Sequence, residues 1–122
     1  MKKRILLIDD EVITLKTTKM LLGQRGFEVE AAQNTSEAIS VLTSTKIDMI
    51  LLDISMPTIS GFDFIKLMKA LRIDVPVVFL SNHTDEYTRK MAESEGVKRC
   101  INKGEEFQML PQIVEELLAQ EK

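Results

Sequence analysis

The sequence has a single cysteine, no long apolar run and no cluster of positive charge, and each absence excludes a class of protein. One cysteine, Cys100, excludes an internal disulfide and favours a reducing compartment. No apolar run approaches the ~18 residues of a membrane span, and residues 5–8 are too few for a signal peptide. The formal net charge is −3 and the basic residues are scattered, which argues against a nucleic-acid interface. We therefore expect a cytoplasmic protein that binds neither a membrane nor nucleic acid directly.

What the sequence does contain is the pattern of one α/β domain. Its 122 residues, 44 % of them hydrophobic, suffice for one core, and no linker or low-complexity segment divides them. Short, continuous apolar runs are typical of strands that are buried on both faces of a parallel sheet. The predicted strands are residues 5–8, 27–32, 49–52, 75–80 and 97–101.

Helical periodicity fills the segments between and after these strands. Asn34 followed by Glu37 has the spacing of a capping box, which predicts a helix start. Pro111 must lie in the first turn of the last helix, because proline breaks a helix interior. The five predicted helices carry their apolar positions within residues 15–22, 34–42, 62–71, 84–96 and 107–118.

Alternating strands and helices predict an open, doubly wound α/β fold with a five-stranded parallel sheet and helices on both faces. Right-handed crossovers are expected between the strands. If the first and third strands are neighbours and the second lies outside, the strand order is 2-1-3-4-5, the flavodoxin-like order. Ligands of such sheets bind beyond the carboxyl ends of the strands, so the residues found there are the candidate site.

Polar residues stand where four of the five predicted strands end. Asp9 and Asp10 follow the first strand, and Asp53, Ser81 and Lys103 follow the third, fourth and fifth. Carboxylates ~5 Å apart would repel by roughly 3 kcal/mol per pair at an effective dielectric near 20. A hard divalent cation such as Mg²⁺ would compensate that repulsion, and Lys103 would add a further positive charge. Because a carboxylate can form an acyl phosphate, this set suits phosphoryl transfer to Asp53.

In these residues the chain resembles a receiver domain of a bacterial two-component response regulator, the chemotaxis-regulator-like family. The resemblance covers residues 1–122 as one domain, and the residues that carry it are Asp9, Asp10, Asp53 followed by "ISMP", Gly61, Ser81 and Lys103. It implies that Asp53 accepts a phosphoryl group from a sensor histidine kinase or a phosphotransfer protein.

The same resemblance implies a role for each residue around Asp53. Mg²⁺ would be bound directly by Asp10, Asp53 and the backbone carbonyl of Ser55, with Asp9 acting through water. Lys103 would contact the phosphoryl group. Ser81 would be the switch hydroxyl that moves towards it.

The resemblance also implies how the signal leaves the domain. Phosphorylation would change the surface formed by the helix at 84–96, the strand at 97–101 and the last helix. That surface would regulate a downstream protein or an output domain, and it could form a homodimer. We expect no enzyme activity beyond the domain's own phosphorylation and hydrolysis.

Three positions depart from the family's usual pattern. Cys100 stands three residues before Lys103, where the family usually carries tyrosine or phenylalanine. Gly104 replaces the usual proline after the lysine, so a trans peptide is expected there, since a cis bond before a non-proline residue costs ~2.5–4 kcal/mol. Asn82 is larger than the usual residue after Ser81 and would narrow access to Asp53.

Other functions compete with the leading hypothesis. Cys100 and Gly104 favour a phosphorylation-independent docking module. A Mg²⁺-dependent phosphatase with an aspartyl nucleophile would carry a second aspartate at the position of Ser55. A flavin or nucleotide binder needs a phosphate loop after the first strand, where "DDEV" would repel phosphate.

Three further points stay open at this level. His83 is either incidental or a modulator of phosphate lifetime. The thin apolar stripe of the helix at 84–96 indicates either low stability or a partner surface. The chain is either a stand-alone receiver or a piece of a longer regulator.

Overall fold

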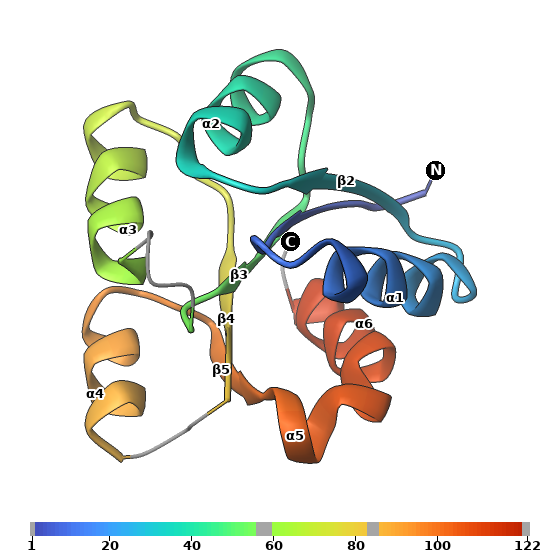
Figure 1. Ribbon diagram of the computed structural model, residues 1–122. Helices are drawn as coiled ribbons and strands as arrows, with labels where there is room; N and C mark the ends of the chain where they lie inside the picture. The colour runs from blue at the N-terminus through green and yellow to red at the C-terminus, as the bar shows by residue number, and fades with distance from the viewer. Residues whose placement is uncertain (1, 56–59, 83–85, 121–122) are drawn as a thin grey trace.

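A computed structural model of the chain describes residues 2–55, 60–82 and 86–120. Its centre is one sheet of five parallel strands in the order β2-β1-β3-β4-β5, which confirms the predicted topology (Figure 1). The strands are β1 (Arg4–Ile8), β2 (Glu28–Ala32), β3 (Met49–Asp53), β4 (Val77–Ser81) and β5 (Arg99–Asn102).

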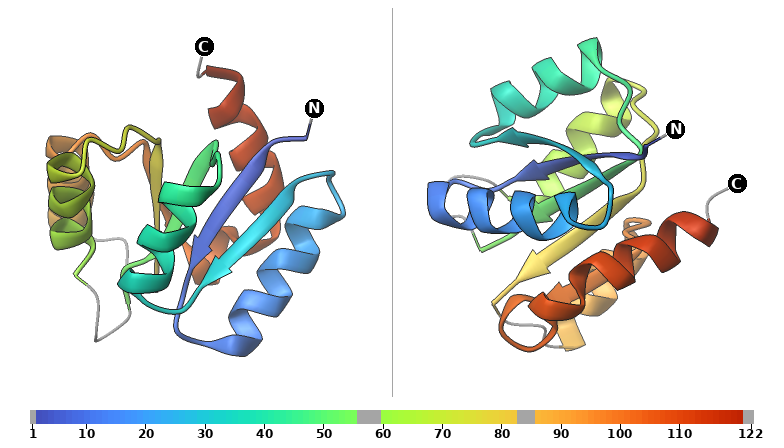
Figure 2. Two further views of the ribbon diagram at one scale, coloured as in Figure 1. Left: turned by 90° about the horizontal axis from the view of Figure 1, so that it is seen from above. Right: turned by 90° about the vertical axis from the view of Figure 1, so that its right-hand side faces the viewer.

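Helices cover both faces of the sheet. They are α1 (Val12–Gly23), α2 (Thr35–Ser44), α3 (Gly61–Ala70), α4 (Glu86–Ser94), α5 (Lys103–Glu106) and α6 (Leu110–Gln120), with a 3₁₀ turn η1 (Phe107–Met109) before the last. Helices α1 and α6 lie on one face, and α2, α3 and α4 lie on the other (Figures 1 and 2). Within the part of the chain that the structure describes, no helix is long and apolar enough to cross a bilayer.

The continuous apolar strands build two core layers, because successive side chains point to opposite faces. In β1, Ile5 and Leu7 join the layer beneath α1 and α6, whereas Leu6 and Ile8 join the layer beneath α2, α3 and α4. All four side chains are fully buried. A strand that is apolar on both faces can therefore hold its carboxyl end rigidly at the edge of the sheet.

The helix starts follow from local hydrogen bonds. Asn34 accepts from the backbone N–H of Glu37 at 2.8 Å, and the Glu37 carboxylate accepts from the N–H of Gln33 at 2.8 Å, so the predicted capping pattern begins α2. At α3, Ser60 accepts from the N–H of Asp63 at 3.3 Å. The start predicted for the helix at 84–96 lies outside the described residues, and α4 is described from Glu86 onwards.

The last predicted helix begins at Leu110, so Pro111 lies in its first turn as predicted, whereas Phe107 lies before it. Phe107 belongs to the 3₁₀ turn η1, and the short helix α5, which was not predicted, fills residues 103–106 between β5 and η1. Pro111 is the second residue of α6, and it is tolerated there because the first turn of a helix needs no N–H from it. The chain therefore turns twice after β5 before the long helix begins.

Two strands begin two residues later and end one residue later than predicted. The strand predicted at 75–80 is described as Val77–Ser81, preceded by Pro76, whose carbonyl accepts from the N–H of Ile50 at 2.9 Å. The strand predicted at 97–101 is described as Arg99–Asn102. As a result β4 includes Ser81 as its last residue, and β5 ends directly before Lys103.

Candidate functional site

The carboxyl edge of the sheet brings together residues from four segments of the sequence. Asp9 directly follows β1, Asp53 and Ser81 are the last residues of β3 and β4, and Lys103 follows β5. Asp9 is fully buried, and only 2 % of Asp53 and 6 % of Ser81 are exposed. Buried polar groups at adjoining strand ends are costly unless they are paired, so their partners define the site.

Lys103 pairs with both buried aspartates. Its Nζ donates to Oδ2 of Asp53 at 2.9 Å and to Oδ2 of Asp9 at 3.5 Å. The lysine side chain is only 13 % exposed. An ammonium group therefore lies between two carboxylates in a place largely shielded from water.

The backbone holds the remaining oxygens of these aspartates. The N–H of Ser55 donates to Oδ1 of Asp53 at 2.8 Å, and the N–H of Glu11 donates to Oδ1 of Asp9 at 3.0 Å. The N–H of Asp9 in turn donates to the carbonyl of Ala32 at 3.0 Å, which ties the end of β1 to β2. Both carboxylates are thus fixed in orientation by the chain that follows their strands.

Glu11 joins the two aspartates in a group of three carboxylates. One oxygen from each of Asp9, Glu11 and Asp53 lies within 4.8 Å of the others. Glu11 is the N-cap residue of α1, but its side chain makes no capping hydrogen bond. Its carboxylate instead adds a third negative charge beside the buried pair.

Burial and charge shift the pKa values of Asp9 and Lys103. Burial raises the pKa of Asp9 from 3.8 to about 6, and the charge of Asp53 adds to the rise, although the N–H of Glu11 and the Lys103 ammonium oppose it. Burial alone would lower the pKa of Lys103, but its hydrogen bond to Asp53 and the charges of Asp53 and Asp9 outweigh burial, so the pKa is raised. Lys103 is therefore positively charged at neutral pH.

The structure places the other predicted site residues around this centre. Asp10 is exposed and lies outside the carboxylate group. Ser55 is exposed, and its Oγ accepts from the N–H of Asn82 at 3.1 Å, which joins the segment after Asp53 to the segment after β4. The roles predicted for all the site residues, Asp9, Asp10, Asp53, Ser55, Ser81 and Lys103, stay predictions. His83, Met56 and Pro57 lie outside the described residues.

Sequence reasoning did not assign a role to Glu11. The sequence places three acids in a row after β1, but it does not show which side chains turn towards Asp53 once the strand has ended. The turn that Asp9 forms with the N–H of Glu11 decides this. An acidic residue at the N-cap position would have suggested helix capping instead.

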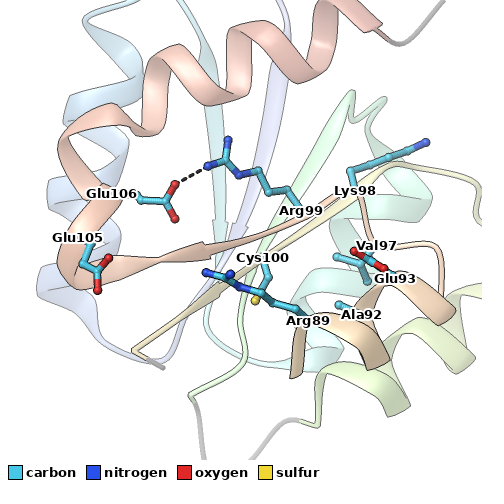
Figure 3. A pocket seen from close by; sticks show the side chains of 9 residues that line it. All are labelled: Arg89, Ala92, Glu93, Val97, Lys98, Arg99, Cys100, Glu105 and Glu106. Atoms are coloured by element: carbon cyan, nitrogen blue, oxygen red, sulfur yellow. Dashed lines mark hydrogen bonds and ion pairs between the residues drawn. The ribbon is translucent and has the colours of Figure 1, made fainter. Parts of the chain in front are cut away.

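The departures at Cys100 and Gly104 have visible consequences. Cys100 is half-buried in β5 and lines a hollow of about 580 Å³, which side chains of α4 and α5 also line (Figure 3). Among the described residues there is no cis peptide bond, so the bond between Lys103 and Gly104 is trans, as predicted. Lys103 nevertheless reaches Asp53.

Comparison with known proteins decides the family. The family model of the response regulator receiver domain matches residues 5–115. The chain belongs to this family. Receiver domains are modules of two-component signalling rather than typical enzymes, and they bind Mg²⁺ at an acidic pocket.

Individual relatives agree with this assignment. Response regulator SaeR of Staphylococcus aureus (strain USA300) is 32% identical over 99 residues, which are 81% of this chain and 43% of SaeR. The chain thus spans less than half the length of the curated relatives it matches. A response regulator receiver domain protein of Clostridium thermocellum is 29% identical, with a TM-score of 0.84 over 97% of this chain and 95% of that one. A Francisella response regulator receiver domain shares the fold, with a TM-score of 0.89 at 21% identity over 99% of this chain and 100% of that one.

The donor set of the site fits Mg²⁺. Asp9, Glu11 and Asp53 offer carboxylate oxygens, the hard ligands that Mg²⁺ prefers, within 4.8 Å of one another. Lys103 contacts the two aspartates, and no ion pair between Lys103 and Glu11 is found among the described residues. Three carboxylates against one ammonium leave negative charge that a divalent cation can offset.

Proposed function

We propose that this chain is a phosphorylation-gated receiver in which Asp53 accepts a phosphoryl group from a sensor histidine kinase or a phosphotransfer protein. The observation that carries the proposal is the contact of 2.9 Å between the Lys103 ammonium and the buried Asp53 carboxylate, beside two further carboxylates. Residues 1–122 act as one receiver domain in the cytoplasm, a compartment in keeping with the single cysteine.

Each residue has a role in the transfer. A carboxylate oxygen of Asp53 forms a bond to phosphorus, and the bond from phosphorus to the donor's imidazole nitrogen breaks, with that nitrogen keeping the electron pair. Phosphorylation would remove the negative charge of the Asp53 carboxylate and add that of the phosphoryl oxygens. The Lys103 ammonium would then pair with the phosphoryl oxygens. Ser81, which is buried at the end of β4, would donate its hydroxyl to the new group.

Mg²⁺ would be held by the carboxylates at this edge of the sheet. Asp53, Asp10 and the carbonyl of Ser55 are the direct ligands that the resemblance implies, and Asp9 would act through water. Glu11 is added because its carboxylate is grouped with those of Asp9 and Asp53. When bound, the ion would neutralise charge on the phosphoryl oxygens.

The output would be a change in the surface of α4, β5 and the helices after β5. The movement of Ser81 towards the phosphoryl group would displace the segment that follows β4. Exposed side chains on α4, Tyr87 (73 % exposed) and Met91 (37 % exposed), would then be presented differently to a downstream protein, an output domain or a second copy.

The test is the intact mass of the protein after incubation with acetyl phosphate, with and without Mg²⁺. The wild type should gain one phosphoryl group only with Mg²⁺, and Asp53→Asn should gain none while keeping its fold. Asp63→Asn is the matched control, because the same change is made at an exposed carboxylate of α3. Uptake by Asp53→Asn equal to that of the wild type would contradict the proposal.

The alternative of a phosphorylation-independent docking module has its own expected result. Cys100 and the hollow beside it are the observations that favour it, since the position carries no aromatic switch residue. If the wild type took up no phosphate while a known receiver was labelled under the same conditions, and no histidine kinase labelled it either, the docking module would replace the proposed function.

A further inference from the structure

The lysine that contacts Asp53, Lys103, lies in a helix that is too short to be stable by itself. Helix α5 has only four residues, Lys103–Glu106, and Lys103 is the first of them. A helix this short forms too few internal hydrogen bonds to overcome the cost of nucleation. The position of the Lys103 backbone must therefore be set by contacts made at the ends of α5.

Asn102 supplies the contacts at the N-terminal end. Its Oδ1 accepts from the backbone N–H of Gly104 at 2.8 Å and from that of Glu105 at 3.0 Å. Both bonds start at Asn102 and end beyond Lys103 in the sequence, so they fix the backbone of Lys103. A Cβ at Gly104 would lie 3.3 Å from this oxygen, so the glycine leaves the cap uncrowded.

Glu106 completes the arrangement from the C-terminal end of α5. Its Oε1 accepts from the N–H of Asn102 at 3.1 Å, and this bond links the C-terminal end of α5 to the last residue of β5. Its other carboxylate oxygen accepts from the guanidinium of Arg99 in β5, as Figure 3 shows. The cap at Asn102 is thus attached to the sheet, and it is not a feature of a free loop.

We propose that Asn102 is a positioning residue for Lys103, holding the ammonium between Asp9 and Asp53, and hence for phosphorylation of Asp53; the second part rests on the proposed function. The lysine side chain is 13 % exposed and makes both ion contacts from this one backbone position. Without the cap, α5 loses the bonds that fix its first turn, and the ammonium leaves the two carboxylates for water.

The first test measures the placement of Lys103 without any phosphorylation. Each lysine amine is acylated with an N-hydroxysuccinimide ester in magnesium-free buffer, and the rates are read by peptide mass spectrometry. Asn102→Ala should raise the rate at Lys103 about five- to tenfold, while Asn102→Ser, which restores a capping oxygen, should keep it slow. Equal rates at Lys103 in the wild type and Asn102→Ala would overturn the proposal.

The matched control is Asn34→Ala, which removes the same kind of cap from α2, where the Asn34 side chain accepts from the N–H of Glu37 at 2.8 Å. It should lower stability as Asn102→Ala does and leave acylation of Lys103 unchanged. If Asn34→Ala raised that rate equally, the effect would be general loosening of the fold, and the proposal would fail.

The second test is a double-mutant cycle on the rate of phosphorylation by acetyl phosphate with Mg²⁺. Asn102→Ala should slow the wild type about five- to tenfold and should add nothing in a Lys103→Ala background, because Asn102 acts through the lysine. The same slowing in both backgrounds would mean a role independent of Lys103 and would overturn the proposal. A wild type that binds no phosphate at all would contradict the proposed function, while the acylation rates would still decide whether Asn102 positions Lys103.

Discussion

Ionised Asp9 should destabilise the folded protein at neutral pH in the absence of Mg²⁺. Its side chain is fully buried, and its pKa is raised from 3.8 to about 6. Because the folded-state pKa lies above the unfolded value, the folded protein binds more protons than the unfolded chain between about pH 4 and pH 6. The contribution of Asp9 to the free energy of unfolding therefore falls as the pH rises through that window.

The magnitude follows from the size of the rise in pKa. A change from 3.8 to about 6 corresponds to at most about 3 kcal/mol of unfolding free energy, at 1.36 kcal/mol for each tenfold change in the proton equilibrium. Asp9→Asn keeps the shape and the oxygen that accepts from Glu11 but cannot ionise. The variant should therefore be more stable than the wild type by up to about 3 kcal/mol at pH 7.5 and about equally stable at pH 4.

The titration of Lys103 does not affect this comparison of unfolding free energies. Its pKa is raised above 10.5, so the stability it contributes is fully present throughout the window of Asp9 and is lost only in more alkaline solution. Urea unfolding followed by far-ultraviolet circular dichroism, from pH 4 to pH 8 with a chelator, gives the comparison directly. An Asp9→Asn variant that is no more stable at pH 7.5, or that differs equally at pH 4 and pH 7.5, would refute the reasoning.

Four other substitutions have definite expected outcomes. Gly61→Ala should destabilise the fold by about 1–3 kcal/mol in urea unfolding, because the new Cβ would lie 2.6 Å from Cγ2 of Ile54. Thr18→Val should raise the free energy of unfolding by about 1 kcal/mol, since among the described residues the buried Thr18 hydroxyl has no hydrogen-bond partner. Glu11→Gln should weaken Mg²⁺ binding at least about fivefold in calorimetric titration, because the charge that it removes is grouped with the carboxylates of Asp9 and Asp53. Asp10→Asn should weaken it too, because the family resemblance implies that Asp10 is a direct ligand.

Controls and contrary results for these substitutions are equally specific. Glu30→Gln makes the same change as Glu11→Gln at an exposed position of β2 and should leave the affinity for Mg²⁺ unchanged. Unchanged affinity in Glu11→Gln would remove Glu11 from the site. Wild-type stability of Gly61→Ala would mean that the side chain of Ile54 moves aside without cost, and a less stable Thr18→Val would indicate a water bound to the hydroxyl.

The fold could be predicted because its three central strands, β1, β3 and β4, are buried on both faces. Runs such as residues 5–8 and 49–52 are continuous in apolar side chains, which few structures other than a covered parallel sheet require. The short helix α5 could not be predicted, because its four residues are too few to show a period. Only Pro111 marked where the long helix had to begin.

The sequence was enough to predict which residues lie at the strand ends of the site. It was not enough to predict where their side chains point. Asp53, Ser81 and Lys103 could be assigned to one edge because parallel strands end together, and the structure brings Lys103 to Asp53 at 2.9 Å. Glu11 and Asn102 were not predicted as part of the site, because their places depend on local hydrogen bonds with neighbouring residues. Such bonds depend on the geometry of the turn, which cannot be determined from the presence of acidic and amide residues in the sequence alone.

The most direct test of the central claim is to locate the phosphoryl group after labelling with acetyl phosphate and Mg²⁺. Borohydride reduces an acyl phosphate of aspartate to homoserine, so peptide mass spectrometry identifies the residue that carried it. The account predicts homoserine at position 53 and at no other aspartate. Homoserine at another position, or a gain of phosphate with no homoserine at all, would contradict it.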